Sequence, residues 1–220
     1  MVVVGVALMA NLLDPVVPPN LPLAPIEYSA PATNTFSNVL RLYFNRLSTN
    51  LNALLGSIGG QYLNNTYGAF QDSTSQTAVS TTAAYPITFN TTDYSNGVTV
   101  ASSSRLTVAY AGVYNLQFSA QLQNTTNAPV DIDIWLRKNG TDITASNSRF
   151  GLSARKNPGD PFHVIGALNY FVELQATDYI ELVWCTGDVG AGLVAYVAGT
   201  SPTRPSIPSI IATLSFVSAL

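Results

Sequence analysis

The sequence predicts a mainly β protein in which a sheet domain is preceded by one short helix and an extended N-terminal arm. Proline is concentrated in residues 1–32, apolar residues recur at helical spacing in residues 33–60, and they alternate with polar residues over much of residues 61–220. A period of two is typical of half-buried strands and a period near 3.6 of helices. These three patterns therefore divide the chain into an arm, a stalk and a head.

The composition indicates a folded protein that hides part of its surface in an assembly. Of the 220 residues 47% are hydrophobic, which excludes intrinsic disorder. Only 10% are charged, against a usual share of ~25%, so Ser, Thr, Asn and Gln must supply much of the surface. The net charge is −3 and the nine basic residues are spread along the chain. We therefore expect no nucleic-acid partner, because such a partner is bound by a basic patch.

Six prolines in residues 1–32 predict extended or polyproline-like chain, since proline interrupts a helix and restricts the residue before it. Leu21, Leu23 and Ile26 along this arm would expose apolar surface unless another protein covered them. We therefore expect the arm to anchor the chain to a partner. A free terminus without a partner is the alternative.

Residues 2–13 form an apolar run that ends at Asp14 and Pro15. The run is too short to span a bilayer, which takes ~20 apolar residues, so no membrane span is expected. It has the length of a signal peptide, but no Lys or Arg precedes Arg41 and the basic start of such a peptide is missing. A docking segment is the favoured interpretation, and a cleaved signal is the alternative.

Residues 33–60 carry one apolar stripe whose members are separated alternately by four and three residues. This heptad spacing is typical of parallel helices that pack around a shared axis, and the large side chains favour three helices over two. Asn34 or Thr35 is expected to cap the start, and Gly56 or the pair at residues 59–60 to end the helix. The alternative is an amphipathic helix lying on its own head domain. The stripe consists of Leu40, Phe44, Leu47, Leu51, Leu54 and Ile58.

Residues 61–220 are expected to form about eight short strands. Asn139 and Gly140 favour a two-residue hairpin turn with positive φ at both positions. Strands this short and this regularly spaced predict a sandwich or jelly roll. The expected strands include residues 113–122, 130–136, 162–174, 178–184, 193–197 and 210–220. The predicted core of the head includes Tyr114, Leu116, Phe118, Ile134, Leu136 and Trp184.

Three stretches of the head resemble a known family. Residues 112–118 are similar to a Gly-x-Tyr-x-Phe-x-Phe strand, residues 134–140 to an apolar strand that runs into Lys-Asn-Gly, and residues 174–182 to a Leu-x-x-Gly-Asp-x-Ile-x-Leu turn. Together, in this order, they resemble the tumour-necrosis-factor-like jelly roll, especially the globular head of the first complement component and its bacterial and phage relatives. The resemblance implies a homotrimer of jelly rolls packed around a threefold axis. Thr177 departs from the pattern, because the family usually has Gly there.

Residues 38–45, followed by a Gly-Gly break and then residues 67–72, resemble structural proteins of tailed phages, particularly those of marine cyanobacteria. This resemblance implies a bacteriophage virion protein with its arm in the particle and its head outward. A tail fibre or knob for host attachment and a capsid decoration protein both fit. The expected partners are other virion proteins at the arm and a host surface glycan or receptor at the head. The alternative is a secreted complement-head-like ligand-binding module, which predicts cleavage of the N-terminal run.

Few side chains are suited to catalysis, and we expect neither enzyme activity nor a cofactor or bound metal. His163 is the only imidazole, and Cys185 lies in an apolar run that predicts a buried, inert thiol. Asp131 and Asp133 share one face of a predicted strand; a solvated face is the favoured interpretation and a Ca²⁺ site near a threefold axis the alternative. Candidates for sugar or receptor contacts in exposed loops are Tyr94, Arg149, Arg155 and Tyr196.

Overall fold

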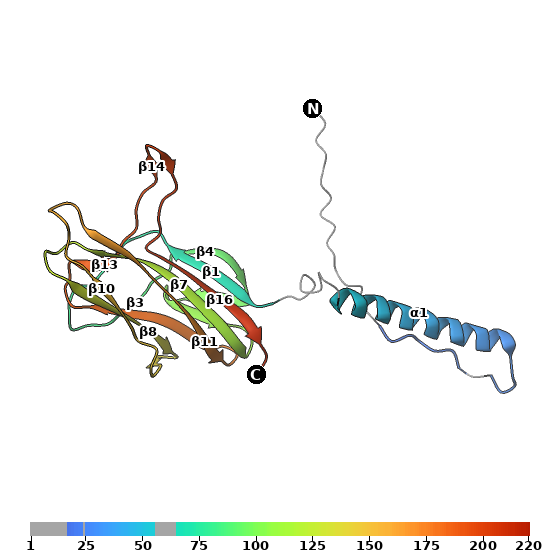
Figure 1. Cartoon of the computed structure of the whole chain (residues 1–220). Helices are drawn as coiled ribbons and strands as arrows, with labels where there is room; N and C mark the ends of the chain where they lie inside the picture. Colours follow the sequence, from blue (N-terminus) through green and yellow to red (C-terminus); the bar gives the residue numbers. More distant parts are fainter. Residues whose placement is uncertain (1–16, 24, 56–64) are drawn as a thin grey trace, which may run out of the picture. The chain divides into compact units, whose positions relative to one another are not determined.

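The computed structural model describes residues 17–23, 25–55 and 65–220, without the side chains of residues 53–55. The chain divides into two compact units, residues 1–64 and 65–220 (Figure 1). The first unit contains the helix α1 (Ala30–Leu55), and the second contains the strands. Within the described ranges, no helix is both long and apolar enough to cross a membrane.

The helix α1 begins three residues before the predicted start. The Ser29 hydroxyl accepts a hydrogen bond from the amide of Ala32 (3.4 Å) and caps the helix. Pro31 stands in the first turn, where its missing N–H costs no helical hydrogen bond. The predicted caps Asn34 and Thr35 were therefore wrong, because both lie inside the helix. The predicted terminators at residues 56, 59 and 60 lie outside the described residues.

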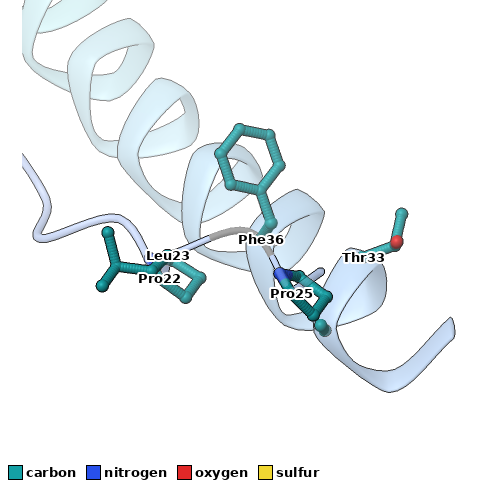
Figure 2. A pocket seen from close by; sticks show the side chains of 6 residues that line it. Pro22, Leu23, Pro25, Thr33 and Phe36 are labelled. Carbon is teal, nitrogen blue, oxygen red and sulfur yellow. The ribbon is translucent and has the colours of Figure 1, made fainter. Parts of the chain in front are cut away.

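The described arm residues have neither helix nor strand and lie along one side of α1. A hollow of about 250 Å³ separates the two, as Figure 2 shows, and a second hollow follows further along the helix. The arm runs antiparallel to α1, because Pro22 faces the start of the helix and Val17 its middle. Leu21, Leu23 and Ile26 are exposed. The first hollow is lined by Pro22, Leu23, Pro25, Ala32, Thr33 and Phe36, and the second by Val17, Pro19, Val39, Leu42, Tyr43 and Arg46.

The head is a sandwich of two antiparallel sheets. In sheet A the strand β7 has β11 along one edge, while β16 and then β13 follow one another along its other edge. The order continues from β13 to β2 and from β16 to β1 and β4. The strands of sheet A are β1 (Tyr67–Asp72), β2 (Gln76–Thr77), β4 (Thr91–Asn96), β7 (Gly112–Asn124), β11 (Phe162–Leu174), β13 (Ala191–Leu193) and β16 (Ile210–Ser218).

Sheet B has the order β10-β8-β12-β6-β5, with β9 on β8 and β3 on β12. The chain crosses repeatedly between the sheets, from β7 to β8, from β10 to β11, from β11 to β12 and from β12 to β13. This crossing makes the sandwich jelly-roll-like. The strands of sheet B are β3 (Tyr85–Pro86), β5 (Val98–Ala101), β6 (Arg105–Val108), β8 (Val130–Lys138), β9 (Thr141–Asp142), β10 (Ser148–Leu152) and β12 (Tyr179–Thr186); β14 (Gly199–Thr200) and β15 (Thr203–Arg204) form a separate ribbon.

Two strand predictions need correction. The strand predicted over 193–197 ends at Leu193, because the chain leaves the sheet there and Tyr196 pairs instead with Ile207 at the base of the ribbon. The head also has more strands than the eight expected, since several are two residues long and residues 91–96 form an edge strand without alternating burial. The hairpin at Asn139 and Gly140 has positive φ at both residues, 48° and 82°, as predicted.

The core lies between the facing sides of the two sheets. Trp184 packs against Tyr85 with ring centroids 5.8 Å apart. The Tyr114 hydroxyl donates a hydrogen bond to the Tyr110 carbonyl (2.7 Å), so its burial leaves no polar group unpaired. Burial raises the pKa of Tyr114. Six core side chains have exposed fractions of 4% or less: Tyr114, Leu116, Phe118, Ile134, Leu136 and Trp184.

Gly112 shows why the first family-like motif begins with glycine. A Cβ at this position would lie 2.9 Å from the Ser218 carbonyl oxygen and closer still to the Phe216 ring. The strands β7 and β16 can approach one another here only because residue 112 has no side chain.

Thr177 occupies a turn that normally requires glycine. The amide of Asp178 donates to the Gln175 carbonyl (3.0 Å), and Thr177 has φ of 71°. This is the third position of a turn whose geometry suits glycine, and a β-branched residue is strained there. Burial acts to raise the pKa of Asp178, but hydrogen bonds from Asn139, Gln175 and Lys138 outweigh it and the pKa is lowered. These bonds hold the turn in place despite the strain.

Thr177→Gly is expected to raise the free energy of unfolding of the head by about 0.5–1 kcal/mol. Relief of left-handed strain exceeds the added flexibility of glycine in the unfolded chain. Urea unfolding followed by tryptophan fluorescence measures the change. Ala176→Gly is the matched control, because Ala176 in the same turn has no positive φ and its replacement should destabilise the head. A lower stability of Thr177→Gly would show that the threonine side chain stabilises the turn.

Candidate functional site

The two sheets present outer faces of very different chemistry. The sheet A outer face consists of the outward-pointing residues of β7, β11 and β16. It carries one carboxylate, Glu173, one imidazole, His163, and no Lys or Arg. Its members are Val113, Asn115, Gln117, Ser119, Gln121, Gln123, His163, Ile165, Ala167, Asn169, Phe171, Glu173, Ile211, Thr213, Ser215 and Val217.

Antiparallel register brings these side chains into continuous rows across the three strands. Ile165 lies opposite Gln121, and Phe171 lies opposite Asn115. On the other side of β7, Gln117 lies opposite Thr213. Apolar side chains on this face are exposed to a large degree, with 66% for Phe171 and 59% for Ile165. The face therefore offers apolar and amide groups to a partner with almost no charge to desolvate.

Sheet B carries ion pairs on its outer side. The Arg149 guanidinium donates to both carboxylate oxygens of Asp133, at 2.9 and 3.0 Å, and its Nε lies 3.8 Å from Asp131. Asp131 and Asp133 thus share a face, as predicted, and an arginine on the adjacent strand balances their charge. Other pairs on or near this sheet are Arg137–Asp142 (2.7 Å), Lys138–Asp178 (3.0 Å) and Arg105–Glu181 (3.5 Å). This side therefore carries several paired charges, whereas the sheet A outer face carries one carboxylate.

The residues considered for chemistry do not come together in one place. Cys185 is half-buried, not fully buried as predicted, because it points to the outer side of β12 opposite Asp133. Burial, and then the negative charge of Asp133, raise the pKa of the Cys185 thiol and keep it protonated. His163 is exposed near the start of β11. No group of three or more His, Cys, Asp or Glu residues in the described ranges could hold a metal ion.

The helix leaves part of its predicted stripe open. Phe44 and Leu51 are 56% and 48% exposed, whereas Leu40 and Leu47 are half-buried. Of the remaining stripe residues, the side chain of Leu54 and the whole of Ile58 lie outside the described residues. The hollows between arm and helix are lined instead by Phe36, Val39 and Tyr43, among others.

The loop residues named as sugar or receptor candidates are scattered. Arg149 is engaged with Asp133, Arg155 donates to the Thr125 carbonyl (3.1 Å), and Tyr94 lies on the edge strand β4. Tyr196 lines a sizeable hollow in the described part of the chain, together with Arg204, which no sequence motif singled out.

Known proteins that resemble this chain are found among solved structures. No protein-family model matches the chain, and no curated protein matches it. The solved structures that it resembles include the globular domain of zebrafish complement 1qA protein. That match covers 71% of this chain and 99% of that chain, with 13% identical residues and a TM-score of 0.43. A likeness at this level carries no argument about function, and the description of the head as a jelly-roll-like sandwich rests on its own strand order.

Proposed function

We propose that the chain is a structural protein of a phage virion, a homotrimer displayed on the particle as a fibre, a knob or a capsid decoration protein. The observation that carries the proposal is the contrast between the two outer sides of the sandwich. The sheet A outer face is almost uncharged, whereas the outer side of sheet B carries ion pairs. Depletion of charge and exposure of aromatic and aliphatic groups are typical of surfaces that subunits cover. A second and a third copy of the head are the proposed cover of the rows from Val113 to Ser119 of β7, which leaves Gln121, Gln123 and His163 open.

One unpaired atom supports this assignment. The side-chain oxygen of Asn115 is buried and accepts no hydrogen bond within the described part of the chain. A buried acceptor without a donor costs about 1–3 kcal/mol, so a donor from a neighbouring copy would stabilise the assembly. Asn115 lies opposite the exposed Phe171, within the proposed contact.

The helix provides a second line of support. Phe44 and Leu51 remain open to solvent in the single chain, at the spacing that a parallel three-helix stalk requires. The hollows along the arm are lined by other helix residues, among them Phe36, Val39 and Tyr43, and not by Phe44 or Leu51.

The virion location is inferred from the sequence resemblance of residues 38–45 and Tyr67–Asp72 to structural proteins of tailed phages. An arm with Leu23 and Ile26 exposed at 96% and 106% fits a segment that is buried on docking to another protein. Other virion proteins are the proposed partners of this arm. The head is proposed to contact the host surface. No catalytic role is proposed.

Light scattering tests the association. The full chain is expected at three times its mass of 23.4 kDa. Residues 65–220 form a separate compact unit with its own core and should fold alone. They are also expected to be trimeric, because the proposed contact between copies lies on their sheet A outer face. A monomeric full chain contradicts the trimer, and a monomeric head within a trimeric full chain would assign the association to the stalk alone.

A further inference from the structure

A hollow of about 540 Å³ lies between one end of sheet A and the hairpin ribbon of residues 196–207, which contains β14 and β15 and projects from the sandwich (Figure 1). Its size falls in the ~300–1,000 Å³ range of ligand sites in proteins. Sheet A contributes Gln121 and His163, and the ribbon contributes Tyr196, Val197, Ala198, Gly199, Arg204 and Ile207.

The ribbon holds its side of the hollow in a fixed geometry. Tyr196 and Ile207 exchange two backbone hydrogen bonds of 2.8 Å at its base. Gly199 pairs with Arg204, and Thr200 with Thr203, further along. The base is also linked to the sheet, because the Tyr196 hydroxyl accepts a hydrogen bond from the Gln123 amide (3.3 Å). The hollow is therefore built before any ligand arrives.

Arg204 is a cation that the chain leaves available. Its side chain makes no ion pair or hydrogen bond within the described residues. A Cβ at position 199 would lie 2.6 Å from the Arg204 Nε and 2.7 Å from its Cγ, so the arginine lies directly against the backbone of Gly199. The absence of a side chain at Gly199 thus lets Arg204 lie along the wall of the hollow. A guanidinium in such a position suits two parallel hydrogen bonds to a carboxylate.

The rest of the lining offers a ring surface and hydrogen-bonding groups. The His163 and Tyr196 rings meet edge to face, with centroids 5.7 Å apart, and the Tyr196 oxygen lies 3.2 and 3.3 Å from the two ring nitrogens of His163. Burial raises the pKa of Tyr196, so its phenol stays protonated. Gln121 adds an amide, and Val197 and Ile207 add apolar contacts. Apolar surface beside amide, imidazole and phenol groups suits a sugar ring with its hydroxyls.

We propose that this hollow binds a carboxylated saccharide of the uronic or sialic acid type. Arg204 binds the sugar carboxylate, Gln121 and His163 bind hydroxyls, and the Tyr196 ring, Val197 and Ile207 contact the apolar face of the sugar ring. This inference rests on the proposed contact of the head with a host surface and names the chemistry of that contact.

The position of the hollow fits such a contact. The chain enters sheet A at Thr66, whose carbonyl accepts from the Phe216 amide, beside the Gly112 end of β7. Gln121 lies nine residues further along the same strand, which is roughly 30 Å at ~3.3 Å per residue. The hollow therefore lies at the end of sheet A remote from the chain entry.

Isothermal titration calorimetry of the full chain tests the proposal, with D-glucuronic acid and N-acetylneuraminic acid as probes. D-glucose, which lacks the carboxylate, is expected to bind at least tenfold more weakly than glucuronic acid. Arg204→Gln should weaken binding of the acidic sugars by roughly 10- to 100-fold, the usual effect of a charged hydrogen-bond donor. Gly199→Ala should also weaken binding, because it displaces Arg204 without removing its charge.

Lys156→Gln is the matched control, since it removes the same charge from an exposed site outside the hollow and should leave binding unchanged. Inorganic phosphate is the simple-anion probe and should bind more weakly than either acidic sugar. The proposal is overturned if neither acidic sugar binds, if glucose or phosphate binds as tightly as glucuronic acid, or if Arg204→Gln has no effect. Light scattering of the same variants keeps this result separate from the trimer, because loss of sugar binding by an intact trimer concerns only this site.

Discussion

Phe171→Asp, introduced into the isolated head of residues 65–220, is expected to convert the trimer into a monomer. The measured mass should fall threefold. Phe171 is 66% exposed and lies on the outer side of β11, opposite Asn115. Three aspartates would be buried near a threefold contact without a basic partner, because this face has no Lys or Arg. An unpaired buried carboxylate costs several kcal/mol, which exceeds what one contact between subunits recovers. Light scattering at several protein concentrations measures the change.

The head itself should remain folded in this variant, since the side chain of Phe171 is not part of the core. Circular dichroism and urea unfolding check this point. Val79→Asp is the control, because Val79 is 87% exposed and lies outside the sheet A outer face, just beyond β2. A trimer that survives Phe171→Asp would assign the threefold contact to another surface of the head.

Asn124→Ala is expected to lower the free energy of unfolding of the head by about 3 kcal/mol. The Asn124 side chain is completely buried at the end of β7. Its amide nitrogen donates to the carbonyls of Ala128 (2.8 Å) and Ser153 (2.9 Å), and its oxygen accepts from the Thr126 amide and hydroxyl, both at 2.8 Å. The substitution removes three part-buried hydrogen bonds to backbone groups, at about 1 kcal/mol each.

Urea unfolding of the isolated head measures this loss, with Asn147→Ala as the control. Asn147 is exposed, and its side chain makes no hydrogen bond within the described residues. Its replacement should change stability by less than about 0.5 kcal/mol. Equal stability of the two variants would mean that water replaces the lost partners of Asn124. Because Asn124 begins an Asn-Thr-Thr tripeptide, the same burial makes it unsuitable as a glycosylation acceptor.

The sequence by itself determined the elements that have a strong local signal. Alternation over 113–122 and 130–136 predicted β7 and β8, and the pair Asn139 and Gly140 predicted a hairpin with two positive φ angles. Such signals are readable because the side-chain period and the turn conformation depend on residues close together in the chain. The helix was also predicted, but its start was missed by three residues. Ser29 competes with Asn34 and Thr35 as a cap, and only the folded chain shows which side-chain oxygen accepts from a free backbone amide.

Tertiary structure alone decided how residues distant in the sequence are combined. Strand register places Phe171 opposite Asn115 and leaves the outer sides of β7, β11 and β16 with a single carboxylate, although no local pattern distinguishes that face from the other. Arg204 and Gly199 have no motif, and they meet Tyr196 and His163 only because a ribbon projects from the sandwich beside the end of sheet A. Pairing between strands remote in the chain is set by the packing of the whole core, so the uncharged face and the hollow could not be predicted from local sequence.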